Sequence, residues 1–226
     1  MTSSPEEITT VDGQPREPVS FLVFSASLRE GSLNAQLADL AAGAIQSNGG
    51  TVDRGSMAEF DCPSYNADVQ RDQGFPTGAK ELRRRLEASD AFMICSPEYN
   101  ASMPGLLKNA GDWVSRFHPQ PFHERHALLL SASPSMVGGN RGVWALRVPF
   151  EHLGARIYPD MFSLARAHLA LNDEGQIADE ELRRRFQMTI ASFIDLVEAS
   201  KHYPCVKSAW VEYLGEHPEP AIDRVQ

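Results

Sequence analysis

A run of hydroxyl, amide and guanidinium side chains stands directly before a helical pattern and could bind an anion. The run reads Ser25-Ala26-Ser27-Leu28-Arg29-Glu30-Gly31-Ser32-Leu33-Asn34. A helix N-terminus offers unpaired N–H groups and partial positive charge, so short hydroxyl side chains and an arginine placed there suit a phosphate. The run lacks G-x-G-x-x-G and a G-K-[ST] ending, which argues against a dinucleotide or nucleoside triphosphate loop. Taken alone, it is equally explained by Ser32 as an N-cap and Arg29 as a surface charge.

A second loop holds two prolines and an aromatic ring between an apolar run and a helical pattern. It reads Ser96-Pro97-Glu98-Tyr99-Asn100-Ala101-Ser102-Met103-Pro104-Gly105. A rigid loop of this kind could hold a planar aromatic cofactor and direct backbone N–H groups at its edge. The alternative is a long surface turn, because Pro, Asn, Ser and Gly mark turns as well.

A third loop, Ser131-Ala132-Ser133-Pro134-Ser135-Met136-Val137-Gly138-Gly139-Asn140-Arg141-Gly142, contains adjacent glycines. Adjacent glycines let the backbone approach a ligand closely, and their consecutive N–H groups can form an anion-stabilising nest. By itself the glycine pair indicates little, so the three loops have to be judged together.

Together the loops resemble the NAD(P)H-dependent FMN reductase family, over roughly residues 19–198. The matching motifs, in chain order, are Ser27-Leu28-Arg29-x-x-Ser32-x-Asn34, Pro97-Glu98-Tyr99-Asn100 through Pro104-Gly105-x-x-Lys108-Asn109-Ala110-x-Asp112-Trp113, and Ser133-Pro134 through Gly138-Gly139. The middle motif is the most specific. One position departs from the family, which usually has glycine where this chain has Ala26. A methyl group is tolerable there only if the backbone angle does not demand glycine, so a lower phosphate affinity is expected if it does.

The resemblance implies a cofactor site built from all three loops. It assigns the FMN phosphate to Ser27, Arg29, Ser32 and Asn34, and the isoalloxazine ring to Pro97, Glu98, Tyr99 and Asn100. The pyrimidine side of the ring would face Ser133 and the amides near Gly138 and Gly139.

The resemblance also implies a reaction, in which hydride passes from NAD(P)H through bound FMN to a quinone, azo, metal-ion or free-flavin acceptor. The cofactor carries this chemistry, so no catalytic acid, base or nucleophile is expected. The alternative is a non-catalytic FMN-binding electron carrier or redox sensor. The family often pairs its subunits, which implies a homodimer or homotetramer.

Apolar runs alternate with helical patterns along the chain and predict the elements that position the loops. Strands are expected at 19–24, 51–57, 91–95, 126–131 and 155–158, with helices between them and a long helix capped by Asp179 at the end. This alternation predicts a flavodoxin-like, doubly wound, five-stranded parallel sheet of order 2-1-3-4-5 in three layers. Ligands bind such sheets at the carboxyl ends of the strands, beside the point where the strand order reverses.

Composition divides the chain into one domain with two extensions. Residues 1–18 are polar and acidic and predict a disordered N-terminal extension, 19–201 the flavodoxin-like FMN-binding domain, and 202–226 a C-terminal extension. The last segment has Trp210, Tyr213 and Leu214 as its large apolar anchors, which could pack on the domain or on a neighbour.

Charge and hydropathy exclude several classes of partner. The 226 residues carry a formal charge of −9, which argues against nucleic acid and anionic lipid as partners. The basic runs Arg83-Arg84-Arg85 and Arg183-Arg184-Arg185 lie in helical patterns and are expected to form solvated helix faces. No run approaches the ~18 apolar residues of a membrane span.

The cysteines and histidines predict neither disulfides nor a metal site. Cys62, Cys95 and Cys205 are odd in number and form no C-x-x-C pair, which favours a reducing, cytoplasmic location. His118, His123 and His126 cluster in sequence, yet no carboxylate or cysteine accompanies them at ligand spacing.

Overall fold

A computed structural model describes residues 17–202, of which 18–197 form one compact unit. Apart from Glu17, Pro18 and His202, the expected extensions at 1–18 and 202–226 lie outside the described residues. Within the described part of the chain, no helix combines the length and apolar character that crossing a bilayer requires.

A parallel sheet forms the centre of this unit. Five strands follow one another in the order β2-β1-β3-β4-β5, namely β1 (Ser20–Ser25), β2 (Thr51–Ser56), β3 (Ala91–Cys95), β4 (His126–Ala132) and β5 (Arg156–Ile157). Every neighbouring pair is parallel. The strands β1, β3 and β4 are buried along almost their whole length, as expected of strands covered on both faces. The predicted order 2-1-3-4-5 is confirmed.

A single strand was predicted beside β4 at the edge of the sheet, but the structure has two short strands there. β5 pairs with the start of β4, and a sixth strand, β6 (Phe162–Leu164), pairs with its end. Pro159 lies between them and has no N–H group to continue the ladder. The described sheet therefore has six strands, and the strand expected at 155–158 is reduced to its two central residues.

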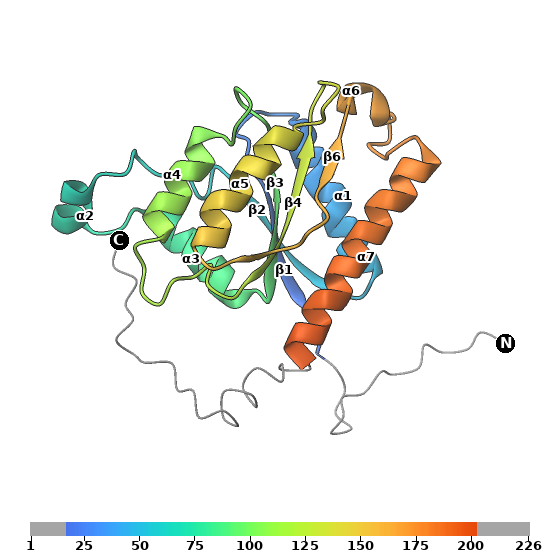
Figure 1. Cartoon of the computed structure of the whole chain (residues 1–226). Coiled ribbons are helices and arrows are strands. Elements are labelled where there is room, and N and C mark those ends of the chain that lie inside the picture. Colours follow the sequence, from blue (N-terminus) through green and yellow to red (C-terminus); the bar gives the residue numbers. More distant parts are fainter. Residues whose placement is uncertain (1–16, 203–226) are drawn as a thin grey trace. The chain divides into compact units, whose positions relative to one another are not determined.

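Helices cover both faces of the sheet and confirm the three layers (Figure 1). α3 (Thr77–Ala88), α4 (Gly105–Val114) and α5 (Asn140–His152) pack on one face. α1 (Leu33–Ser47) and α7 (Glu180–His202), whose buried side chains run from Phe186 to Val197, pack on the other. Two short helices, α2 (Ala67–Gln73) and α6 (Ala167–Ala170), were not predicted, because helices of that length show no apolar stripe.

Caps mark the ends of α1 and the start of α7, where the predicted cap at Asp179 is confirmed. Ser32 Oγ accepts the Asn34 N–H at 3.2 Å and starts α1, which ends at Asn48 and Gly49, the latter at a left-handed φ of 83°. Asp179 Oδ1 accepts the Leu182 N–H at 2.7 Å and starts α7.

The prediction of a solvated face for Arg83–Arg85 is wrong for Arg85. Its side chain is 11% exposed and lies over the Phe60 ring, 5.4 Å from the centroid. It pairs with Glu81 at 2.8 Å, with Asp53 at 3.3 Å and with Glu59. The acidic residues of the neighbouring β2 edge therefore draw this arginine onto the core.

The same cluster predicts acid sensitivity. Hydrogen bonds from Arg84 and Arg85 lower the pKa of Glu81 from 4.5 to about 2. A carboxylate with a lowered pKa stabilises the folded state above its unfolded pKa, and this contribution is lost as the pH falls towards 2. We expect Glu81→Gln to be less stable than the natural chain at neutral pH, by a small amount because the Glu81 carboxylate is close to solvent. Urea midpoints should converge as the pH falls through 4.5 to 2, and a gap independent of pH would contradict this.

Candidate functional site

The loops that follow β1, β3 and β4 leave the same edge of the sheet and are joined by hydrogen bonds (Figure 1). The Ala26 N–H donates to the Cys95 carbonyl at 2.9 Å, and the Ser96 N–H donates to the Leu130 carbonyl at 2.8 Å. The structure thus brings the predicted site residues of all three loops to one edge, as expected at the point where strand order reverses.

The first loop presents unpaired donors to solvent. The Arg29 guanidinium is exposed, and its one hydrogen bond within the described residues goes to the Glu30 carbonyl at 3.3 Å. The backbone N–H groups of Gly31, Ser32 and Leu33 meet no acceptor among the described residues. These donors surround the positive end of α1, so the loop can take an anion without breaking an existing contact.

Asn34, by contrast, makes its hydrogen bonds within the protein. Its side chain is almost fully buried, Nδ2 donates to the Ala132 carbonyl at 2.9 Å, and Oδ1 accepts the Ala132 N–H at 2.9 Å. Both ends of the amide are therefore used to fasten the start of α1 to the end of β4. The assignment of Asn34 to a phosphate stays a prediction, and its observed contacts are those of a positioning residue.

The structure shows that Ala26, where the family usually has glycine, does not need a glycine-specific backbone angle. It is fully buried in the core beside Phe24, and it is not one of the residues with a positive φ. The methyl group therefore stands in ordinary backbone geometry, and the expected cause of a weaker phosphate site is absent at this position.

The second loop is a tight hairpin whose turn is strained. Tyr99 and Ser102 exchange backbone hydrogen bonds of 2.9 and 3.0 Å across Asn100 and Ala101, which lie at φ values of 52° and 62°. Two left-handed residues in succession form the turn that matches strand twist, but alanine adopts this region at a cost. The Tyr99 ring is 47% exposed at the tip of the loop. The hairpin bonds hold this turn, and the exposed Tyr99 ring is available for stacking.

Glu98 of this loop has its carboxylate turned onto α5. The Glu98 side chain is 8% exposed, and its carboxylate accepts the N–H groups of Arg141 at 3.0 Å and Gly142 at 3.2 Å. It also pairs with the Arg141 guanidinium, at 2.9 Å to Nε and 2.6 Å to Nη2. Its predicted place along the isoalloxazine stays untested, while the contacts that the structure shows join the second loop to the third.

The third loop requires both of its glycines. Gly138 and Gly139 have φ values of 62° and 83°. A Cβ on Gly139 would lie 2.0 Å from Ser131 Oγ, and one on Gly138 would lie 2.8 Å from the Ala165 nitrogen. Substitution of either residue would therefore displace the backbone at this edge.

The third loop is held by a segment that the sequence did not predict as part of the site. The Ser133 N–H donates to the Leu164 carbonyl at 3.1 Å, and the Arg166 N–H donates to the Ser135 carbonyl at 3.0 Å. The short alternation Phe162-Ser163-Leu164 was the one available signal for this strand, and three residues are too few to establish a period.

Unsatisfied hydroxyl groups gather at the same edge. The Oγ atoms of Ser25, Ser131 and Ser163 are buried and have no hydrogen-bond partner among the described residues. Ser25 and Ser131 lie in the carboxyl-terminal halves of β1 and β4, and Ser163 is the central residue of β6. Buried polar atoms are normally paired, so this edge has spare hydrogen-bonding capacity of the kind that a polar ligand or ordered water satisfies. The donor set fits a phosphorylated cofactor.

The end of the middle motif, at Asn109 and Trp113, positions the loop that follows β2. Asn109 Nδ2 donates to the carbonyls of Cys62 and Pro63, both at 3.0 Å, and its Oδ1 accepts the Tyr65 N–H at 2.8 Å. The buried Trp113 donates from Nε1 to the Pro63 carbonyl at 2.7 Å. Sequence reasoning missed this role, because nothing in the spacing identifies a loop fifty residues before Trp113 as its partner.

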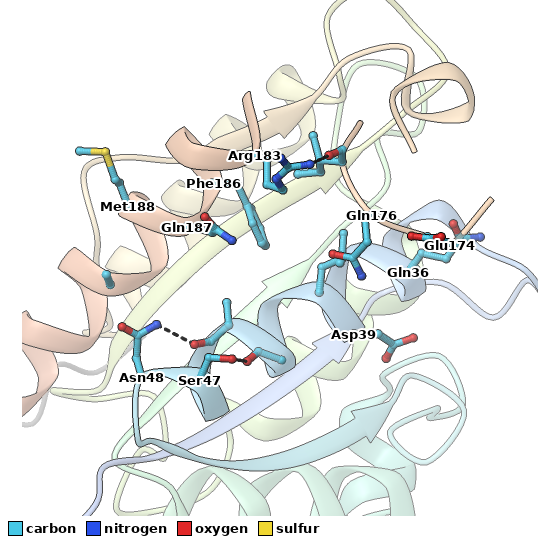
Figure 2. Close-up of a pocket in the computed structure, with 16 residues that line it drawn as sticks. Gln36, Asp39, Ser47, Asn48, Glu174, Gln176, Arg183, Phe186, Gln187 and Met188 are labelled. Atoms are coloured by element: carbon cyan, nitrogen blue, oxygen red, sulfur yellow. Dashed lines mark hydrogen bonds between the residues drawn. The ribbon is translucent and has the colours of Figure 1, made fainter. Parts of the chain in front are cut away.

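A separate groove of about 800 Å³ lies between α1 and α7 (Figure 2). None of the predicted site residues lines it. Three of its polar side chains are used locally: Ser47 and Asn48 donate to the carbonyls of Gly43 and Ala44, and Arg183 donates to the Ile177 carbonyl. The groove is therefore not counted as part of the candidate site.

The cysteines within the described residues are unsuited to nucleophilic chemistry. Burial raises the pKa of the Cys62 thiol to about 11 and raises that of the fully buried Cys95 further. Cys205 lies outside the described residues. Across residues 17–202, no group of three or more His, Cys, Asp and Glu side chains is placed to hold a metal ion.

Comparison with known proteins identifies relatives over most of the chain. Residues 19–169 match the family model described as NADPH-dependent FMN reductase. The chain is 33% identical to an NAD(P)H-dependent FMN reductase of Pseudomonas aeruginosa over 179 residues, which cover 77% of this chain and 92% of that protein. It is 41% identical over 176 residues to a 2-hydroxy-1,4-benzoquinone reductase of a Burkholderia species, covering 73% of this chain and 88% of that one.

A solved structure agrees with this result. The flavoenzyme NAD(P)H:(acceptor) oxidoreductase FerB from Paracoccus denitrificans is 28% identical and superposes with a TM-score of 0.68, covering 81% of this chain and 98% of FerB. The predicted family and fold are confirmed, as is the oxidoreductase class with FMN and NAD(P)H. This chain belongs to the NADPH-dependent FMN reductase family.

Proposed function

We propose that this protein passes hydride from NAD(P)H, through FMN bound at the carboxyl edge of the sheet, to a small-molecule acceptor. The observation that carries the proposal is the convergence of three loops on one edge, with unpaired donors in the first loop and unsatisfied hydroxyls at Ser25 and Ser131, in the strands that lead into the first and third loops. FMN supplies the hydride and electron chemistry when bound, and the protein's part is to bind, orient and stabilise it.

The phosphate is assigned to the first loop. Ser27, Arg29 and Ser32 stand at the start of α1, where the N–H groups of Gly31 to Leu33 point to no acceptor among the described residues. Positive charge and free N–H groups at a helix N-terminus favour a dianionic group, so this loop supplies most of the affinity.

The ring is assigned to the second and third loops. Pro97, Tyr99 and Asn100 lie on the second loop, and Ser133, Gly138 and Gly139 lie on the third. Backbone N–H groups near the two glycines would stabilise negative charge on the pyrimidine side of the ring.

A quinone is the acceptor that the relatives favour. One relative is named as a reductase of 2-hydroxy-1,4-benzoquinone, and others are named as quinone reductases. Azo, metal-ion and free-flavin acceptors are the alternatives, because an open flavin face would accept them as well.

The test is anaerobic reduction of the FMN-loaded protein. Fluorescence quenching first measures FMN binding, and NADPH and NADH are then added separately while the visible flavin absorbance is followed. Stoichiometric bleaching that a benzoquinone reverses is the expected result. Binding of FMN without reduction by either nucleotide would indicate an electron carrier or redox sensor instead. A protein that binds no FMN would contradict the whole proposal.

We also propose a homodimer or homotetramer. Trp144 and Val148 lie one turn apart on α5 and are 56% and 73% exposed, although large apolar side chains are usually buried. Light scattering at working concentration should give a multiple of the 25.0 kDa chain mass, and a monomeric mass would exclude this state.

A cytoplasmic location is proposed as well. Its support is that Cys62 and Cys95 are both free thiols, as expected in a reducing compartment. Fractionation of the producing cells would test it.

A further inference from the structure

We propose that Glu98 is a positioning residue that fastens the 97–104 loop to the N-terminus of α5 and lowers the reduction potential of the bound flavin by cancelling positive charge there. This inference rests on the proposed function, since it concerns the ring that the second and third loops would hold. It differs from the assignment made by resemblance, because Glu98 acts here through α5 and Arg141 and needs no contact with the ring.

Glu98 caps the N-terminus of α5, which has no capping side chain at its own N-cap position. The N-cap position of α5 is Gly139, which offers no side chain, and the first turn contains no acidic residue. The Glu98 carboxylate bonds the N–H groups of Arg141 and Gly142 at 3.0 and 3.2 Å from across the site. It therefore serves as the capping group for a helix more than forty residues further along the chain.

The backbone of α5 is shaped to receive this side chain. A Cβ on Gly142 would lie 3.1 Å from both Cα and Cβ of Glu98, which is closer than a side chain there could stand without displacing the loop. The strained Asn100-Ala101 turn follows Glu98 by two residues, so Glu98 holds the segment that leads into this turn.

Burial makes the charge of Glu98 effective. Its side chain is 8% exposed, whereas that of Arg141 is 61% exposed. A charge held away from water acts on its surroundings through a lower effective dielectric constant than one at the surface. Glu98 thus offsets two positive charges next to Gly138 and Gly139, namely the end of the α5 dipole and the Arg141 guanidinium.

The consequence is a change of potential with a defined sign. Reduction adds negative charge to the flavin, so nearby positive charge favours the reduced form. Glu98→Gln removes a negative charge and should raise the midpoint potential of the bound flavin. Arg141→Gln removes a positive charge and should lower it. If the Glu98–Arg141 pair had a purely structural role, both substitutions would loosen the same two loops, and the two potentials would not be expected to change in opposite directions.

The experiment is a dye-equilibrated redox titration of the FMN-loaded protein at low salt. We expect a change of roughly tenfold in the equilibrium between reduced and oxidised flavin in each variant, in opposite directions, which for a two-electron couple is about 30 mV. Glu151→Gln is the matched control. Glu151 pairs with Arg147 at 2.6 Å on the same helix, but nine residues beyond Gly142, or about 13 Å along the axis. It should leave the potential unchanged.

The outcomes separate this inference from the proposed function. Shifts of the same sign, or an unchanged potential in Glu98→Gln with FMN still bound, would overturn it while leaving the reductase intact. Failure of the natural chain to bind FMN would instead contradict the proposed function. If Glu98→Gln does not fold, Arg141→Gln decides alone, because an unchanged or raised potential in that variant is incompatible with the proposal.

Discussion

Replacing Arg29 with alanine is expected to weaken FMN binding about 10- to 100-fold while leaving the free energy of unfolding unchanged. The guanidinium is exposed and its one hydrogen bond among the described residues, to the Glu30 carbonyl at 3.3 Å, is long. Its removal therefore costs the folded protein almost nothing. In the complex it would lose charge-assisted hydrogen bonds to a phosphate, and such bonds contribute about 1.5–3 kcal/mol each.

Riboflavin provides the matched ligand for this prediction, because it has the same ring and lacks the phosphate. Its affinity should be equal in the natural chain and in Arg29→Ala, as measured by quenching of flavin fluorescence. Arg184→Ala, at an exposed arginine of α7, should leave the FMN affinity unaltered. If Arg29→Ala binds FMN as tightly as the natural chain, or loses riboflavin affinity to the same extent, the phosphate does not lie at this loop.

The fold could be predicted where local signals were strong and continuous. The runs that became β1, β3 and β4 contain four or five apolar residues in succession, and caps such as Ser32 and Asp179 fixed where helices begin. β5 and β6 have two and three residues, and a period cannot be read from so short a segment. Their division depends on Pro159 and on pairing with opposite ends of β4, and pairing is a property of the tertiary structure.

The site could be predicted as a set of loops, but not as a set of contacts. Residue type and position showed that the first loop suits a phosphate, and the free donors around Arg29 agree with that expectation. Type alone does not say whether a polar side chain serves the ligand or a neighbouring loop. Asn34 and Glu98 belong to the matching motifs just as Arg29 does. In the structure, however, the Asn34 amide is hydrogen-bonded to Ala132 and the Glu98 carboxylate to Arg141. Those partners lie 98 and 43 residues away, beyond any local pattern.

Asn34→Ala should therefore be among the most destabilising single substitutions in the chain. It removes two hydrogen bonds of 2.9 Å and leaves the buried N–H and carbonyl of Ala132 unpaired, at a cost of about 2–5 kcal/mol in the free energy of unfolding. Urea unfolding in the absence of flavin measures this directly. Asn48→Ala is the control, since that exposed amide makes one bond, to the Ala44 carbonyl at 2.8 Å, and its loss should cost about 1 kcal/mol or less.

The same variant distinguishes the two roles open to Asn34. If it positions α1 against β4, stability without flavin must fall, and FMN and riboflavin should lose affinity together as the loops loosen. If it touches the phosphate, FMN affinity must fall while riboflavin affinity is retained. An unfolding free energy equal to that of the natural chain would contradict the positioning role. Two buried hydrogen bonds cannot be lost without a cost in stability, so such a result would mean that the amide does not make them and is free to bind a ligand.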